Sequence, residues 1–257
     1  MICAERIGEY LKTENVTVKL YESIDSTNAE AKRYALANET GDPCPVLFVA
    51  KEQSAGRGRM GRFFLSRAES GIYMSLLYYT DAMLSDAVSV TTAAAAITAE
   101  TIEELSGERM RIKWVNDLYN DSGKVCGILT ETLAVGERRA IVVGIGINVG
   151  QVDFPDTLRK IASSVALLVG RECELIARVV DGLLRHAADP CDRSYMAIYR
   201  ERFMLTGARV DLLQNGERIG RGLVLGVDDD GGLLFLPDGQ QESVVVHTGE
   251  VSIRAVE

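Results

Sequence analysis

The sequence has little of what several common functional classes require. Its 257 residues include two histidines, His186 and His247, and five scattered cysteines without a Cys-x-x-Cys pair. A structural zinc site and a Ser-His-Asp triad therefore have little support. No apolar run approaches the roughly 18 residues that cross a bilayer, and the N-terminus lacks a basic region followed by an apolar core. We expect a protein of the reducing cytoplasm with no membrane partner.

An excess of positive charge is also missing. The formal net charge is −9, whereas a general nucleic-acid binder normally carries a basic surface, so we expect no nucleic-acid partner. Hydrophobic residues make up 47% and charged residues 25% of the chain, and prolines number only five. This composition is typical of a globular protein, and the length allows one large domain or a domain of about 150 to 200 residues with a small appendage.

The usual nucleotide-binding and hydrolase signatures are absent as well. Gly123-Lys124 is followed by valine, which excludes a P-loop, and no Gly-x-Ser-x-Gly motif occurs. The run from Gly144 to Gly150 is one residue too long for a dinucleotide fingerprint and falls inside a predicted strand, where its glycines predict a close approach to the backbone. Polar groups and cations without an evident nucleophile remain. They suit catalysis by positioning and charge stabilisation, as in phosphoryl or nucleotidyl transfer.

One segment stands out against this background, the cationic, glycine-rich run from Lys51 to Arg62. It reads Lys-Glu-Gln-Ser-Ala-Gly-Arg-Gly-Arg-Met-Gly-Arg and lies between predicted strands at 46–50 and 71–79. Glycines allow close backbone approach, and guanidinium groups match phosphate and carboxylate oxygens. We predict an anion-binding loop that is mobile without ligand and closes over it; a solvated basic turn is the alternative.

The remaining pattern predicts an α/β arrangement followed by short strands. Further strands are predicted at 16–21, within 111–118, at 124–133 and at 139–149, and helices at 4–12, 29–36, 85–106, 157–169, 173–187 and 191–204. Thr27 and Glu30 have the spacing of a capping box at the second helix. From Gly207 onward, short strands between glycine-rich turns fit a compact β barrel. We place a domain boundary near Leu205, which gives domains of 1–205 and 206–257.

Five ordered motifs carry a resemblance to a known family. They are Asp25-Ser-Thr-Asn28, Gln53-x-x-Gly-Arg-Gly-Arg-x-Gly-Arg62, Lys113-Trp-x-Asn-Asp117, Gly123-Lys-x-x-Gly-Ile-Leu129 and Gly144-Ile-Gly-Ile-Asn148. In this order and spacing they resemble the biotin protein ligases (biotin–[acetyl-CoA-carboxylase] ligase). The tail ending Gly249-Glu-Val-Ser-Ile-Arg254 is similar to their small C-terminal SH3-like domain.

The resemblance implies a fold of the α+β class. It consists of a class II synthetase-like catalytic domain, with a mixed, largely antiparallel sheet and packed helices, plus a C-terminal SH3-like β barrel. Because the ligase-like strand starts by Val16, the chain resembles the form without an N-terminal DNA-binding domain.

The implied reaction has two steps. The biotin carboxylate attacks the α-phosphorus of ATP, which releases pyrophosphate and forms biotinyl-5′-AMP, and a lysine of a biotin carboxyl carrier domain then takes the biotin as an amide. ATP and Mg²⁺ are the implied cofactors. The metal would arrive with the ATP phosphates rather than in an all-protein site, with Asp117 as the candidate neighbour. Monomer and homodimer both stay open.

The resemblance also implies residue roles. Lys124, bridging the carboxylate and the α-phosphate, and Arg59 would be catalytic. Biotin would be bound by Ser26, Thr27, Asn28, Gln53, Arg57, Gly58, Arg59 and Lys124. The nucleotide would be bound by Arg57, Arg62, Lys113, Asn116, Asp117 and Asn148, and the separate roles of the last three are left open.

The sequence departs from the family pattern at two positions. Val115 stands where the family usually has proline, and Phe64 lies where a tryptophan is common, so aromatic cover over the ligand would be smaller. Two other functions are weighed against biotin ligation. A lipoate or octanoate–protein ligase would use a similar scaffold and chemistry, and a non-catalytic biotin sensor would not need to keep both Lys124 and the arginines.

Overall fold

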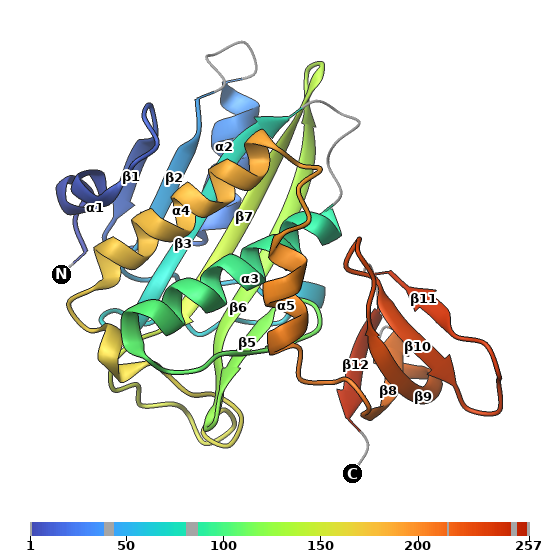
Figure 1. Cartoon of the computed structure of the whole chain (residues 1–257). Coiled ribbons are helices and arrows are strands. Elements are labelled where there is room, and N and C mark those ends of the chain that lie inside the picture. The colour runs from blue at the N-terminus through green and yellow to red at the C-terminus, as the bar shows by residue number, and fades with distance from the viewer. Residues whose placement is uncertain (1, 39–43, 81–86, 215, 248–250, 256–257) are drawn as a thin grey trace.

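A mixed seven-stranded sheet forms the centre of the molecule (Figure 1). The computed structural model describes residues 2–38, 44–80, 87–214, 216–247 and 251–255. The strands of this sheet are β1 (Thr17–Tyr21), β2 (Val46–Ala50), β3 (Gly71–Thr80), β4 (Arg111–Lys113), β5 (Asp117–Asn120), β6 (Gly123–Val135) and β7 (Arg138–Asn148). Their order is β1-β2-β3-β7-β6-β5-β4. Only β1 and β2 pair in parallel, so the predicted mixed, largely antiparallel sheet is confirmed.

Helices cover both faces of this sheet. Helices α3 (Ala87–Ser106) and α4 (Glu172–Ala188) cross one face, with α1 (Ala4–Tyr10) beside α4 and α5 (Tyr195–Arg202) beside α3 (Figure 1). The alanines at 93–96 of α3 are fully buried, which lets the helix pack closely on the sheet. Helix α2 (Thr27–Ala37) packs on the opposite face, where Ala31 and Ala35 join the cluster around Phe48. The beginning of α2 is therefore held on the face that faces away from α3.

One predicted helix is wrong. Residues 157–169 form turns and one short 3₁₀ helix, Ala166–Leu168, instead of an α-helix. The segment runs beside β6, where the Lys124 N–H donates to the carbonyl of Ile161 and the Ser163 N–H donates to the carbonyl of Lys124. Because these backbone groups pair with β6, they are not available for the hydrogen bonds of an α-helix. The helix predicted at 191–204 is shorter than expected, and the proposed start of α3 at 85–86 lies outside the described residues.

The C-terminal residues form a separate antiparallel sheet. Its strands are β8 (Arg209–Gln214), β9 (Glu217–Val227), β10 (Leu233–Pro237), β11 (Val244–Val246) and β12 (Val251–Ala255), in the order β11-β10-β9-β8-β12. Gly249 and Glu250 of the family-like tail lie outside the described residues. The turn between β9 and β10 contacts the rest of the molecule, because the indole N–H of Trp114 donates to the Gly231 carbonyl at 3.0 Å. Among the helices that the structure describes, none is long and apolar enough to cross a membrane.

Candidate functional site

A cavity of about 450 Å³ opens on the face of the sheet that carries α2. Its walls come from the start of α2, the loop that follows β2, the turn between β4 and β5, strands β6 and β7, and the segment 154–162. All residues predicted for the site lie on these walls: Ser26, Thr27, Asn28, Gln53, Arg57, Gly58, Arg59, Arg62, Lys113, Asn116, Asp117, Lys124 and Asn148. The fold thus brings five separate sequence motifs to one cavity.

Glycines in β6 and β7 make room on the floor of this cavity. A Cβ atom added to Gly144 would lie 2.0 Å from the Asn28 amide oxygen, and one added to Gly146 would lie 2.5 Å from the Phe64 ring. Both distances are far below van der Waals contact, so neither position accepts a side chain without a shift of its neighbour. The predicted close approach to this strand is confirmed, and the approaching groups are side chains of the protein itself.

The glycine-arginine segment is a short hairpin with its own backbone pairing. Gln53 bridges Ser66, and the Gly58 N–H donates to the Arg62 carbonyl at 2.7 Å. At its tip, Met60 has φ 57° and Gly61 has φ 70°, both in the left-handed region. This conformation costs a residue with a Cβ more than a glycine, which accounts for glycine at position 61.

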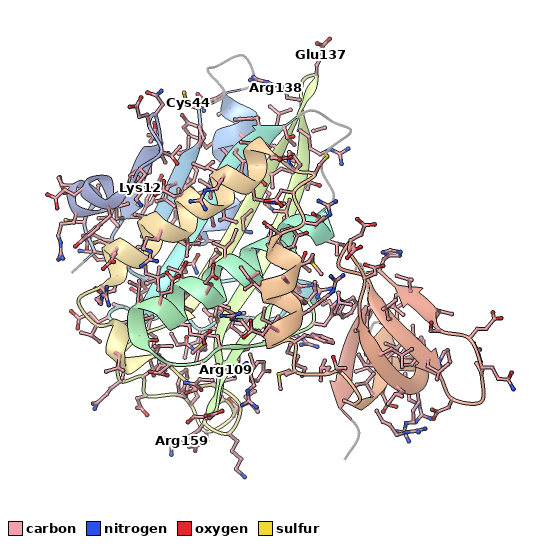
Figure 2. All side chains as sticks on the ribbon, in the orientation of Figure 1. Lys12, Cys44, Arg109, Glu137, Arg138 and Arg159 are labelled. Carbon is pink, nitrogen blue, oxygen red and sulfur yellow. The ribbon has the colours of Figure 1, made fainter. Side chains whose placement is uncertain are left out.

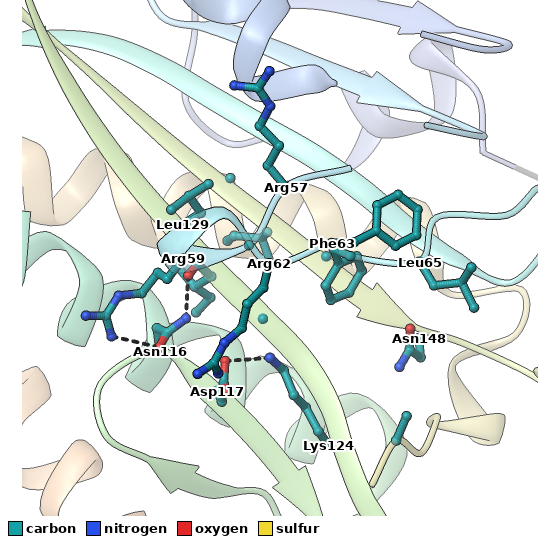
Figure 3. A pocket seen from close by; sticks show the side chains of 18 of the residues that line it. Arg57, Arg59, Arg62, Phe63, Leu65, Asn116, Asp117, Lys124, Leu129 and Asn148 are labelled. Carbon is teal, nitrogen blue, oxygen red and sulfur yellow. Dashed lines mark hydrogen bonds and ion pairs between the residues drawn. The ribbon is translucent and has the colours of Figure 1, made fainter. Parts of the chain in front are cut away.

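The three arginines of the hairpin point to different places. Arg59 and Arg62 extend to the side of the cavity that holds Asn116 and Asp117, whereas Arg57 extends away from them (Figure 3). An Arg59 guanidinium nitrogen donates to the Asn116 amide oxygen at 3.2 Å. Burial lowers the pKa of Arg59 below its ordinary value, with the Asp117 charge acting in the opposite direction. Arg59 is therefore a partly desolvated cation that faces the cavity.

Lys124 and Asp117 form an ion pair at the same end of the cavity. The Lys124 ammonium nitrogen lies 2.7 Å from a carboxylate oxygen of Asp117, and the two side chains are 30% and 20% exposed. Because Lys124 is the second residue of β6 and Asp117 the first of β5, strand pairing fixes the bases of both side chains. Burial, and then the nearby Asp117 charge, raise the pKa of the neighbouring Tyr119 to about 12. The Lys113 ammonium lies 5.9 Å from the centre of the Tyr119 ring.

The opposite end of the cavity is built from neutral polar groups. Ser26 is the N-cap of α2, and its hydroxyl accepts from the Ala29 N–H at 3.4 Å, so the predicted capping box at Thr27 is wrong by one residue. The Thr27 side chain therefore does not cap the helix, and its hydroxyl lies 3.1 Å from the Gln53 amide oxygen. The Gln53 amide oxygen accepts from the Thr27 N–H at 2.8 Å, and its amide nitrogen donates to the Ser66 hydroxyl at 2.9 Å.

Asn28 is held by residues that sequence reasoning missed. Its amide nitrogen donates to the Leu129 carbonyl at 3.2 Å and to a Glu131 carboxylate oxygen at 2.8 Å, and its amide oxygen accepts from the Ser75 hydroxyl at 2.6 Å. Glu131 also pairs with Lys32 at 2.7 Å. The sequence did contain a signal for Ser75, because it is the only small polar residue in the otherwise apolar and aromatic run Ile72–Leu77.

The other two asparagines are also fixed by backbone carbonyls. Asn116 donates to the Ile128 carbonyl and Asn148 to the Ser163 carbonyl, each at 2.8 Å. Each contact uses one of the two N–H donors of the amide and fixes which way the amide faces. These contacts tie the predicted nucleotide-binding asparagines to β6 and to the segment beside it.

The charge of the cavity wall is opposite to that of the chain. Five cationic side chains line it, and Asp117 is the single carboxylate among the lining residues; the cations are Arg57, Arg59, Arg62, Lys113 and Lys124. Within the described part of the chain, no group of three or more His, Cys, Asp or Glu residues could hold a metal ion. This donor set suits an anionic ligand, and a divalent cation would have to bring most of its own oxygen ligands.

Comparison with known proteins identifies the family. Residues 20–148, half of the chain, match the sequence model of the Biotin/lipoate A/B protein ligase family. The chain is 37% identical over 243 residues to the bifunctional ligase/repressor BirA of Bacillus subtilis, covering 88% of this chain and 71% of that protein. It is 29% identical over 239 residues to the biotin–[acetyl-CoA-carboxylase] ligase of Mycobacterium tuberculosis, covering 88% and 85%.

A solved structure shares the fold. The biotin protein ligase from Aquifex aeolicus in complex with biotin and ATP superimposes with a TM-score of 0.75 and 24% identity, covering 93% of this chain and 99% of that chain. The resemblance drawn from the five motifs is thus confirmed. The chain belongs to the Biotin/lipoate A/B protein ligase family.

Proposed function

We propose that the protein is an ATP-dependent biotin ligase, which converts biotin to biotinyl-5′-AMP and transfers the biotin to a lysine of a biotin carboxyl carrier domain. Relatives named biotin–[acetyl-CoA-carboxylase] ligase support the reaction class. The observation that carries the proposal is the division of one cavity into a neutral polar end and a cationic end. A ligand with a neutral polar head and an anionic tail fits that division.

Charge stabilisation by the cationic end is the main catalytic contribution. A carboxylate oxygen of biotin forms a bond to the α-phosphorus of ATP while the bond from that phosphorus to pyrophosphate breaks. Two anions must approach each other, so Lys124 and Arg59, as catalytic residues, lower their repulsion. Each such cation contributes on the order of 3 kcal/mol to the stability of the transition state. Arg62 and Lys113 carry further positive charge for the nucleotide phosphates.

The second step needs little from the protein beyond positioning. The carrier lysine attacks the acyl carbon of biotinyl-5′-AMP with its neutral amine, an amide bond forms, AMP leaves, and the amine loses a proton. Closure of the hairpin over the adenylate would exclude water and so favour transfer over hydrolysis. Mg²⁺ would be bound mainly by the ATP phosphates, and Asp117 is the carboxylate of the cavity wall that would lie nearest to it.

The remaining features of the proposal concern organisation and partners. We place the catalytic domain at 1–205 and the C-terminal domain at 206–257, and assign the C-terminal sheet to an SH3-like barrel. The five cysteines are free thiols, which supports a cytoplasmic location. The net charge of −9 supports the absence of a nucleic-acid partner. A homodimer stays a proposal that sedimentation would test.

Pyrophosphate release by the purified protein tests the function. The assay is run with ATP and either biotin, lipoate or octanoate, with a carrier domain present, and labelling of the carrier is followed by mass spectrometry. We expect turnover and labelling with biotin. Pyrophosphate release with lipoate or octanoate but not with biotin would overturn the proposal. Binding of biotin without pyrophosphate release would identify a sensor.

A further inference from the structure

Tyr119 lies at the cationic end of the cavity, where strands β4, β5 and β6 run side by side. It lines the cavity together with Lys113, Asp117 and Lys124, although none of the five motifs includes it. Strand pairing places it directly opposite Lys124 of β6, and places Asp117 directly opposite Lys113 of β4. The diagonal from Tyr119 to Lys113 is a distance that an aromatic ring and a long side chain can span.

The Lys113 ammonium contacts the Tyr119 ring along this diagonal. Its nitrogen lies 5.9 Å from the ring centre, within the roughly 6 Å over which an aromatic face attracts a cation. Arg111 is the β4 residue directly opposite Tyr119. Its guanidinium, however, donates to the Asn120 carbonyl at 3.1 Å and lies 3.3 Å from an Asp121 carboxylate oxygen. The ring therefore receives the lysine rather than the arginine.

The two lysines of this end contact groups of different charge. Lys124 lies 2.7 Å from an Asp117 carboxylate oxygen, so part of its charge is balanced before any ligand arrives. Burial raises the pKa of Tyr119 to about 12, so its ring adds no negative charge beside Lys113 at neutral pH. The face of a neutral ring attracts an ammonium group without neutralising it, and the charge stays available to an anion.

Positive charges crowd this end of the cavity. Arg59, Arg62 and Lys124 all extend to this side (Figure 3), and each of them repels the Lys113 ammonium. The flexible stem of a lysine also lets its ammonium turn away from the wall, and fixing it there costs conformational entropy. Attraction to the Tyr119 ring offsets both effects, so the charge is in place before a ligand binds.

We propose that Tyr119 is a positioning residue whose ring holds the Lys113 ammonium at the wall of the cavity, with its charge available to the phosphates of ATP. The inference rests on the proposed function and adds a residue to its nucleotide end. The functional group is the ring of Tyr119 and not its hydroxyl. A phenylalanine should therefore replace this tyrosine, whereas an aliphatic side chain should not.

The dissociation constant for ATP, measured by titration calorimetry on the purified protein, tests this role. In Tyr119→Leu the Lys113 ammonium loses the ring, so we expect the Kd for ATP to rise about 3- to 10-fold while the Kd for biotin stays within twofold of the parent. Tyr119→Phe keeps the ring and should stay within twofold for both ligands. Thermal unfolding is measured for each variant, and Tyr119→Met, with the same expected result, is used if the leucine variant does not fold.

A double-mutant cycle separates the contact with Lys113 from a general loss of packing. Lys113→Met removes the cation and should raise the Kd for ATP at least as much as Tyr119→Leu does. Adding Tyr119→Leu to Lys113→Met should change this Kd by less than twofold, because the ring has no cation left to hold. Tyr79→Leu is the matched control. The Tyr79 ring also has a cation over it, Arg138 at 5.0 Å near the tip of the β6–β7 hairpin (Figure 2), but it does not line the cavity, so the Kd for ATP should not change.

The outcomes separate this inference from the proposed function. Pyrophosphate release with biotin by the parent supports the function whatever the variants do, and a parent that binds ATP without that release overturns the function alone. A folded Tyr119→Leu protein that binds ATP within twofold of the parent overturns the inference alone. An equal loss in Tyr119→Phe, or losses that multiply in the double variant, would also overturn it. A parent that binds no ATP would overturn both.

Discussion

Replacing Lys124 by methionine removes one charge from the cationic end of the cavity and has two separable effects. The first effect is on stability. At 2.7 Å from Asp117 and an effective dielectric constant of about 20, the Coulomb attraction is about 6 kcal/mol. The cost of desolvating both groups offsets most of it, and both side chains keep some solvent exposure. We therefore expect the free energy of unfolding to fall by about 1–2 kcal/mol.

The second effect is on the chemical step. A cation that faces the developing charge contributes about 3 kcal/mol, so kcat for pyrophosphate release should fall by at least 100-fold. Adding Asp117→Asn to Lys124→Met removes the carboxylate that was left without its partner. The double variant should regain most of the lost stability, measured by urea unfolding, and none of the lost rate.

The refuting results differ for the two effects. A Lys124→Met protein that releases pyrophosphate within threefold of the parent rate would remove Lys124 from the catalytic group. A double variant that regained activity along with stability would mean that Lys124 acts only by neutralising Asp117. Lys12→Met, at an exposed lysine in another part of the fold, is the control and should change neither quantity (Figure 2).

Three further changes test other parts of the structure. Arg59→Ala should lower kcat by 10- to 100-fold with a small change in melting temperature, since its partly buried charge serves the cavity. Gly144→Ala should raise the KM for biotin more than tenfold, because the added Cβ would lie 2.0 Å from the Asn28 amide oxygen. Arg33 lowers the pKa of Asp25 to about 2, so Arg33→Met should cost under about 1 kcal/mol at neutral pH in urea unfolding. A carboxyl group whose pKa is lower in the folded protein adds its full stability only above the pKa that it has in the unfolded chain. The cost of Arg33→Met should therefore disappear as the pH falls from about 4 to 2.

Each of these predictions has an outcome that contradicts it. Unchanged kcat in Arg59→Ala would assign the arginine to a purely structural role. Gly8→Ala lies in α1 with no atom within 4 Å of the added Cβ, so an equal effect there would rule out the Asn28 clash as the cause for Gly144. A stability difference for Arg33→Met that stayed constant down to pH 2 would show that the ion pair with Asp25 is not its source.

The sequence predicted the elements whose signals are local. The apolar run at 46–50 matches β2 residue for residue, and the glycines of β7 correctly indicated a close approach to the backbone. The wrong helix at 157–169 had a helical apolar period, but its backbone pairs with the start of β6. Periodicity reports which residues are apolar, whereas the partner of each backbone group is decided by tertiary structure.

The residues of the candidate site divide in the same way, into those with a local sequence signal and those whose role depends on tertiary contacts. Motif residues such as Lys124 and Gln53 could be found because their types and spacing are unusual together. Glu131 could not, since a glutamate in a predicted strand is common, and its importance comes from a contact with Asn28, 103 positions away along the chain. The spacing of the arginines in the loop also does not show where their side chains point: Arg57 extends away from Arg59 and Arg62 (Figure 3).

The two ends of the cavity recognise a ligand by different physical means, and this difference determines how a substrate must lie. At the neutral end the Gln53 amide oxygen accepts from the Thr27 N–H, and Leu129 and Glu131 hold the Asn28 amide, so a ligand meets neutral polar groups there. At the other end, Arg59, Arg62 and Lys124 lie on the side of the cavity that holds Asp117, so an anion is favoured there (Figure 3). A molecule with a ureido head and a carboxylate tail satisfies both ends in one orientation only. With the proposed roles of Lys124 and Arg59, that orientation would bring the carboxylate to the cations that also serve the ATP phosphate, so recognition of the head group would place the reacting atom.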